Sequence, residues 1–128
     1  MKYACLIYDS EEKRAALSKA GLDARMGEYF AFDEGIRKSG HYLAGEALQS
    51  VQTAVTVRIR NGTLSTTDGP FAETKEQLGG FYLVDARDLN EAIQLASKIP
   101  SARLGSIEVR PIRESISSRR ENGQVARE

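Results

Sequence analysis

Residues 67–85 combine charged side chains with residues that restrict the backbone. Asp68 precedes a Gly69-Pro70 corner, in which glycine permits unusual backbone angles and proline fixes its own φ. A carboxylate that is held stiffly beside apolar side chains is suited to proton transfer near neutral pH. The alternative is that Asp68 accepts hydrogen bonds from its own loop, which is the usual role of aspartate at such corners.

Further candidates for a binding site surround this corner. Phe71 and Phe81 could supply apolar walls, and Gly79-Gly80 leaves room for a molecule beside the strand. Glu73 and Lys75 either line the same site or, together with the adjacent Glu76, form a salt-linked loop or a dimer contact. Arg58, with Arg60, lies on the polar side of its strand, where it either binds an anion or faces water.

His41 is the single histidine and the second catalytic candidate, because a histidine can exchange a proton near neutral pH. The alternative is a structural role at the start of a strand. His41, Cys5 and the acidic residues lack the spacing of a metal site. The sequence also lacks a phosphate-binding loop, a dinucleotide fingerprint and a serine-nucleophile elbow, so we expect neither a metal nor a cofactor.

Composition narrows the class of protein. The chain has 128 residues, enough for one domain, with 41% apolar and 28% charged residues. Lys plus Arg and Asp plus Glu both number 18, and this balance argues against a nucleic-acid partner. No apolar run approaches the ~20 residues of a membrane span. A single cysteine excludes an internal disulfide, so the expected location is the cytoplasm.

The hydrophobic pattern predicts the elements that must position these residues. Strands are expected at 2–8, 41–48, 79–84 and 106–112, with a hairpin at 53–60 and 63–67 around Asn61-Gly62. Helices are expected at 10–38, broken or bent near Gly21, and at 88–99. Tyr29, Phe30 and Phe32 fall in the first helix, and we expect this cluster to pack in the core rather than to form a ligand box. Pro111 indicates that the last strand lies at a sheet edge.

This order of elements predicts an α+β fold, a ferredoxin-like sandwich of the dimeric α/β-barrel type with a mainly antiparallel sheet and its helices on one face. The domain is expected to span 1–114. Residues 115–128 are polar, lack an apolar period and are predicted to form a mobile tail. The strands are apolar on both sides, so a second copy of the chain is expected to cover the open face of the sheet as a homodimer.

Several motifs resemble one known family. They are Asp68-Gly69-Pro70-Phe71, Glu73, Lys75-Glu76 and Leu78-Gly79-Gly80-Phe81, with Gly45-Glu46-Ala47-Leu48, Ala54…Val57-Arg58 and Gly105…Glu108-Val109-Arg110-Pro111. Over roughly residues 2–113 the chain resembles the YCII-related superfamily, in its DGPF-domain branch. The resemblance implies a ferredoxin-like dimer with a pocket at the sheet. His41 is not a hallmark of that branch, although other YCII-related proteins carry a His–Asp pair.

Two classes of function follow. One is a small-molecule enzyme of lyase or isomerase type, which would work by acid/base chemistry without a cofactor. The resemblance supports it, because a related member of the superfamily acts as a dehydrochlorinase. The other is a non-catalytic ligand-binding or regulatory module, since some members of the branch are encoded beside, or fused to, extracytoplasmic-function sigma factors.

Overall fold

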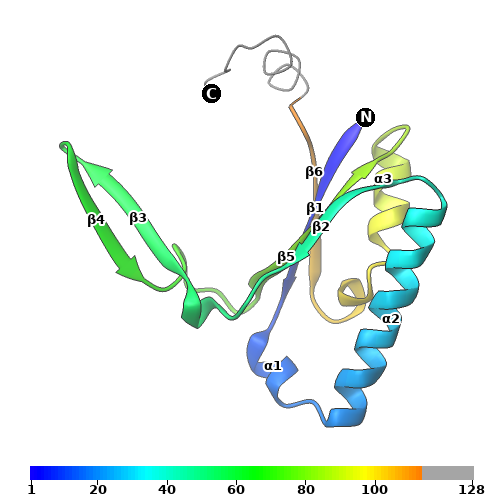
Figure 1. Ribbon diagram of the computed structural model, residues 1–128, viewed down its shortest axis with the longest axis horizontal. Coiled ribbons are helices and arrows are strands. Elements are labelled where there is room, and N and C mark those ends of the chain that lie inside the picture. The colour runs from blue at the N-terminus through cyan, green and yellow to red at the C-terminus, as the bar shows by residue number, and fades with distance from the viewer. Residues whose placement is uncertain (114–128) are drawn as a thin grey trace.

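The computed structural model describes residues 1–113, so the predicted tail at 115–128 lies outside the described residues. Strands and helices follow the predicted order (Figure 1). The strands are β1 (Lys2–Asp9), β2 (Tyr42–Ala47), β3 (Val55–Arg60), β4 (Thr63–Asp68), β5 (Gln77–Asp85) and β6 (Ser106–Pro111). The helices are α1 (Glu11–Ala15), α2 (Lys19–Lys38) and α3 (Leu89–Ala96), with short 3-10 turns at η1 (Val51–Thr53) and η2 (Pro100–Arg103).

Four strands form the main sheet in the order β2-β5-β1-β6, and every neighbouring pair is antiparallel. Helices α2 and α3 lie together on one face of this sheet (Figure 1). The predicted ferredoxin-like α+β fold is therefore confirmed. Pro111 closes β6, which is an edge strand as expected, because proline has no amide hydrogen to donate to a neighbour.

The core lies between the sheet and the two helices. Along β1 the side chains of Tyr3, Cys5 and Ile7 are buried, whereas the residues between them are only half-buried, as the alternation of side chains in a strand requires. The other core residues come from α2, α3, β5 and the segments that directly follow β5 and α3: Phe32, Ile36, Tyr82, Val84, Ala86, Ala92, Leu95, Ala96 and Ile99. The rings of Phe32 and Tyr82 meet edge to face at 5.1 Å between centroids.

The helix predicted to be broken or bent near Gly21 is completely broken, at a point slightly earlier in the chain. Helix α1 ends at Ala15 and α2 begins at Lys19, because the Ser18 hydroxyl accepts a hydrogen bond from the amide of Gly21 at 3.1 Å and caps a new helix. Gly21 therefore lies inside the first turn of α2. Within residues 1–113 no helix is both long enough and apolar enough to cross a bilayer.

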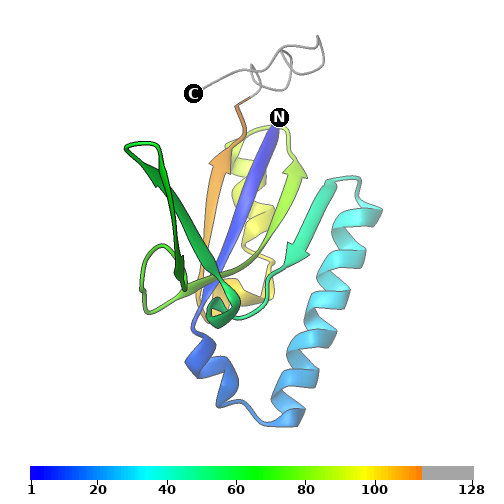
Figure 2. The same cartoon turned by 60° about the vertical axis from the view of Figure 1, so that its left-hand side comes forward.

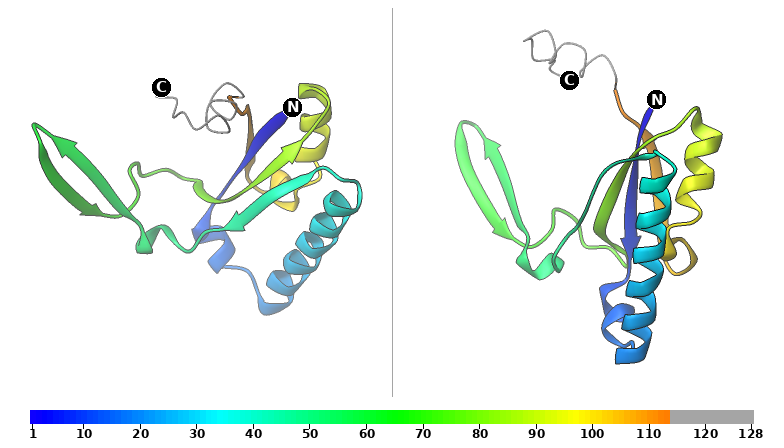
Figure 3. Two further views of the ribbon diagram at one scale, coloured as in Figure 1. Left: turned by 45° about the horizontal axis from the view of Figure 1, so that its top comes forward. Right: turned by 45° about the vertical axis from the view of Figure 1, so that its right-hand side comes forward.

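Strands β3 and β4 form a separate two-stranded hairpin. Asn61 and Gly62 join them with positive φ angles of 52° and 74°, as the Asn-Gly pair predicted. The hairpin projects away from the face of the sheet opposite the helices, like an arm (Figures 2 and 3). The residues that link it to the main sheet include the Asp68 corner, so the position of this corner depends on the hairpin.

Gly80 allows β2 and β5 to approach closely. A Cβ atom on Gly80 would lie 2.8 Å from the backbone oxygen of Glu46, whereas a Cβ on Gly27, in the middle of α2, would meet nothing within 4 Å. We therefore predict that Gly80→Ala lowers the free energy of unfolding by about 1–3 kcal/mol, because backbone must move. Gly27→Ala is the matched control and should raise it by up to ~1 kcal/mol through helix propensity. Urea unfolding of both variants measures this, and equal effects would contradict it.

Candidate functional site

The Asp68 corner is tied to the backbone of the hairpin. Asp68 is exposed at the end of β4, opposite Val55. Gly69 has φ of 107°, its amide donates to the carbonyl of Ala54 at 2.7 Å, and its carbonyl accepts from the Thr56 hydroxyl at 2.8 Å. The permissive glycine that the sequence predicted is therefore needed, since an L side chain rarely adopts this angle.

The other residues predicted around Asp68 spread over different surfaces. Phe71 is 82% exposed, and with Tyr8, Leu48 and Leu78 it lines an apolar cavity of about 480 Å³, which we name the open-face cavity. Lys75 lines a polar depression beside α1, and Glu73 is exposed.

Asp68, Glu73 and Arg58 do not line the open-face cavity. Arg58 lies in β3 and is half-buried. Phe81 is half-buried in β5, on the sheet face opposite Tyr82, and it also contributes to the lining of a second cavity, described below. The structure thus brings Phe71 to a cavity and does not bring it together with Asp68.

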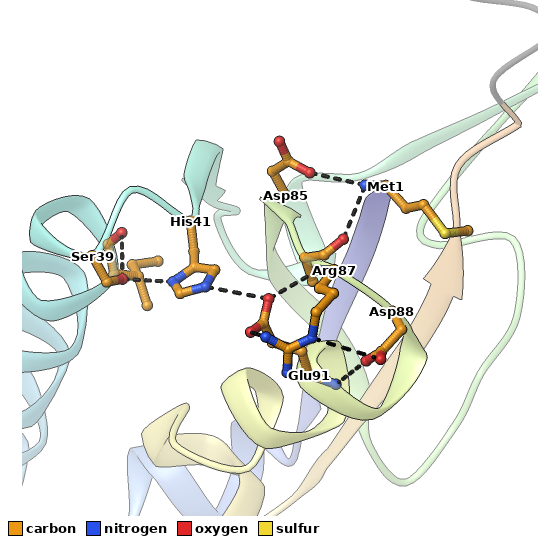
Figure 4. Close-up of polar contacts among 9 residues, drawn as sticks. Met1, Ser39, His41, Asp85, Arg87, Asp88 and Glu91 are labelled. Atoms are coloured by element: carbon orange, nitrogen blue, oxygen red, sulfur yellow. Dashed lines mark hydrogen bonds and ion pairs between the residues drawn. The ribbon is translucent and has the colours of Figure 1, made fainter.

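His41 takes part in a polar cluster that joins the end of α2 to the start of α3 (Figure 4). Its Nδ1 lies 2.6 Å from the Ser39 hydroxyl and its Nε2 lies 3.4 Å from Glu91 Oε1. Glu91 also accepts the amide of Arg87 at 2.9 Å and pairs with its guanidinium at 3.0 Å. The Arg87 amide, followed by the charges of Arg87 and His41, holds the pKa of Glu91 below its usual value. Both ring nitrogens of His41 therefore have partners within the protein.

A different group of polar residues meets at the helix-covered face of the sheet. Asp9 ends β1, Arg25 and Tyr29 lie one turn apart on α2, and Ser101 lies in η2. The Arg25 guanidinium pairs with Asp9 Oδ2 at 3.5 Å, and the Ser101 hydroxyl donates to the same oxygen at 3.3 Å. The hydroxyls of Tyr29 and Ser101 are 2.6 Å apart. Three elements that are distant in sequence therefore converge on one carboxylate.

The direction of these hydrogen bonds follows from the chemistry of the groups. An ionised carboxylate can only accept, so the Ser101 proton points to Asp9, and Tyr29 must then donate its proton to the Ser101 oxygen. Burial raises the pKa of Tyr29, which keeps this hydroxyl protonated and able to donate. Within residues 1–113 the bonds to the Asp9 side chain all reach Oδ2. Oδ1 can therefore accept a proton from a bound molecule.

These four residues line a cavity of about 520 Å³, which we name the Asp9 cavity. Its walls include Leu22, Met26, Tyr42 and Tyr82, and Gly79 and Gly80 line it beside Asp9. A Cβ atom on Gly79 would lie 3.9 Å from Asp9 Oδ1, so the double glycine leaves space next to the unbonded oxygen. The cavity combines apolar walls with a few convergent polar groups, as small-molecule sites do. Within residues 1–113 no group of three or more His, Cys, Asp or Glu residues could hold a metal ion.

Sequence reasoning missed the Asp9 cavity, although two signals pointed towards it. Asp9 continues the buried phase of Tyr3, Cys5 and Ile7, so a carboxylate occupies a position whose side chain faces the helices. Arg25 and Tyr29 follow the four-residue spacing of one helix face. Tyr29 and Phe32 do pack in the core, as predicted, whereas Phe30 is 70% exposed, so this part of the prediction is wrong. The Tyr29 hydroxyl additionally completes the polar network.

Ser101 connects Tyr29 to Asp9, and its side chain is almost completely buried. Ser101→Ala should lower the free energy of unfolding by about 1–3 kcal/mol, because the Tyr29 hydroxyl loses its acceptor in a buried place. The matched control is Ser65→Ala on the exposed hairpin, which should change stability by less than ~0.5 kcal/mol. Chemical unfolding measures both variants. A Ser101 variant as stable as the control would show that the network is not formed.

Comparison with known proteins places the chain in a family. The family model for the YCII-related domain matches residues 1–116. An uncharacterised protein of Rhizobium meliloti (strain 1021) is 39% identical over 114 residues, which cover 88% of this chain and 92% of that protein. The family match spans all the described residues, including the strands and helices that build the Asp9 cavity. The chain therefore belongs to the YCII-related family.

Proposed function

We propose that this YCII-related protein is a small-molecule enzyme that performs cofactor-free acid/base chemistry of lyase or isomerase type in the Asp9 cavity. The observation that carries the proposal is the Asp9 carboxylate, which is anchored through one oxygen and leaves the other unbonded in a largely apolar cavity. A general base needs this fixed orientation and a free lone pair.

The proposed step is proton abstraction from carbon. Asp9 Oδ1 takes the proton, the C–H bond breaks, and its electron pair moves into the adjacent carbonyl group of the bound molecule as an enolate. Arg25 and Ser101 keep Oδ2 in place during this transfer. Return of the proton to a different carbon would complete an isomerisation, whereas departure of a leaving group with the electron pair would complete an elimination.

Deuterium exchange tests this step without knowledge of the physiological substrate. The full chain would be incubated in D2O with phenylpyruvate, or with the neutral ketone 1-phenylpropan-2-one, and loss of the C–H signal followed by NMR. We expect exchange above the protein-free rate with at least one compound, and Asp9→Asn should slow the catalysed part by about 100-fold or more, since a positioned base contributes that much. Asn keeps the size of the side chain but cannot take up the proton.

Asp68→Asn is the matched control, and it also tests the site predicted from sequence, in which Asp68 acts with Phe71, Glu73 and Lys75. Exchange lost in this variant and retained in Asp9→Asn would move the proposed chemistry to the Asp68 corner. Binding of the compounds without any exchange would favour the non-catalytic ligand-binding module, including one linked to a sigma factor.

We further propose that two copies of the chain associate through the open face of the sheet. On this face Leu6, Phe81 and Leu83 are only half-buried. The hairpin adds an apolar stripe on one of its faces, formed by Val55, Val57, Ile59 and Leu64, which are 57%, 59%, 64% and 62% exposed. An isolated two-stranded hairpin is marginally stable in water, so a second copy that covers this stripe would stabilise it.

The motif residues at Asp68–Phe71 support assignment to the DGPF branch. The unpaired buried Cys5 supports a cytoplasmic location.

Sedimentation velocity at about 10 µM protein tests the dimer, a concentration at which a stable interface of standard size stays associated. We expect a dimer for the unaltered chain and a monomer for Ile59→Lys, because the substitution places a charge in the apolar stripe. Ser65→Lys adds the same charge to the opposite face of the hairpin and should leave the dimer intact. A monomeric unaltered chain would contradict the proposal.

A further inference from the structure

We propose that the Asp9 cavity selects small monocarboxylic acids with a compact apolar body, and that the guanidinium of Arg25 binds their carboxylate. This inference rests on the proposed function for the location of the site and adds the class of substrate. It is carried by three features of the cavity, namely the unused donors of Arg25, the charge balance of the lining and the apolar side chains at the mouth.

Arg25 has more hydrogen-bonding capacity than the protein uses. Its side chain is 14% exposed, yet within residues 1–113 its single ion pair is the long contact of 3.5 Å between one terminal nitrogen and Asp9. A guanidinium has five N–H donors in a planar fork that fits a carboxylate. Since the described part of the chain contains no fully buried nitrogen without a partner, the remaining donors of Arg25 are open to the cavity.

The charges of the lining leave one positive charge unmatched. Arg37 bonds to Asp33 at 2.8 Å and lies 3.9 Å from the centre of the Tyr42 ring, so this pair balances itself. Of the other charged residues in the lining, Arg14 and Arg25 are opposed by Asp9, whereas Glu46 directs its side chain to the other face of the sheet.

Two further acids, Glu46 in the lining and Glu11 outside it, have carboxylates that are directed away from the cavity. Glu46 pairs with Phe81 in register, and alternation points its side chain to the other face of the sheet. Glu11 lies near Arg14 but is not part of the lining, and its carboxylate is bonded by the Val51 amide and the Ser50 hydroxyl. One monoanion would neutralise the site.

Apolar side chains complete the class of ligand. Leu22 and Met26 flank Arg25 on α2 and are 41% and 60% exposed at the mouth of the cavity. A hydrocarbon or aromatic body that extends from the bound carboxylate would cover them. With the carboxylate on Arg25, the adjacent carbon atoms of the acid would lie near Asp9, because the guanidinium contacts that residue. Arg25 would therefore bind the carboxylate of the ligand, and the adjacent Asp9 would take the proton.

Binding of phenylacetate and of its neutral isostere phenylacetamide, measured by titration calorimetry on the full chain, tests the inference. We expect phenylacetate to bind more tightly than phenylacetamide. Arg25→Gln should weaken phenylacetate binding roughly 10- to 100-fold, as loss of a charge-assisted hydrogen bond predicts, and leave phenylacetamide unchanged. Arg25→Lys should restore part of the affinity, because it returns the charge without the planar fork.

Two further variants keep the test decisive. Arg14→Gln removes the second cation from a short exposed helix and should weaken phenylacetate binding by about threefold even if Arg25→Gln fails to fold. Arg103→Gln removes an arginine that does not line the Asp9 cavity and should change nothing. The inference would be overturned if phenylacetate and phenylacetamide bound with equal affinity. It would also be overturned if phenylacetate binding were unchanged in both Arg14→Gln and a folded Arg25→Gln variant. Exchange of the neutral ketone would then still support the proposed function, whereas Arg25-dependent binding without any exchange would support the inference alone.

Discussion

The contacts of the Asp9 carboxylate with Arg25 and Ser101 join the central strand β1 to α2 and η2. Asp9 ends β1, Arg25 belongs to α2, and Ser101 belongs to the turn that follows α3. Burial of a carboxylate is costly unless charged and hydrogen-bonding partners compensate it, so the positions of α2 and η2 over the sheet are linked to this group. The Asp9 cavity lies beside this network and is lined by Asp9, Arg25, Tyr29 and Ser101.

The two faces of the main sheet differ in how completely the chain buries their apolar side chains. On the helix side, Tyr3, Cys5 and Ile7 are covered within the chain, and burial raises the pKa of Cys5 to about 11, which keeps its thiol protonated and unreactive. On the other side, the residues of β1 and β5 remain partly accessible, and the hairpin carries its own apolar stripe beyond them. The core on the helix-covered face is therefore complete within one chain, whereas apolar side chains on the opposite face stay partly accessible.

Local patterns in the sequence were sufficient for most of the fold. A continuous apolar run predicted the first strand, alternating apolar residues predicted the strand at 53–60, and Asn61-Gly62 predicted the hairpin turn, because these signals act over a few residues. Ser18 was missed as a helix start because the apolar spacing continues across it. The Asp9 cavity could not be predicted in full, since Asp9, Arg25 and Ser101 meet only through tertiary packing. The double glycine was the useful local clue, because both of its residues line that cavity.

The placement of β1 at the centre of the sheet has a consequence for synthesis of the chain. Its residues pair with β5, at Gln77–Asp85, and with β6, at Ser106–Pro111, so every partner of the first strand is translated late. Such long-range pairing slows folding, because the entropy cost of closing a long loop comes before the contacts that compensate it. While the ribosome makes the middle of the chain, β1 therefore exposes apolar side chains and two unpaired edges, a state that is prone to aggregation. The apolar side chains and both edges of β1 are therefore covered only after β5 and β6 have been synthesised.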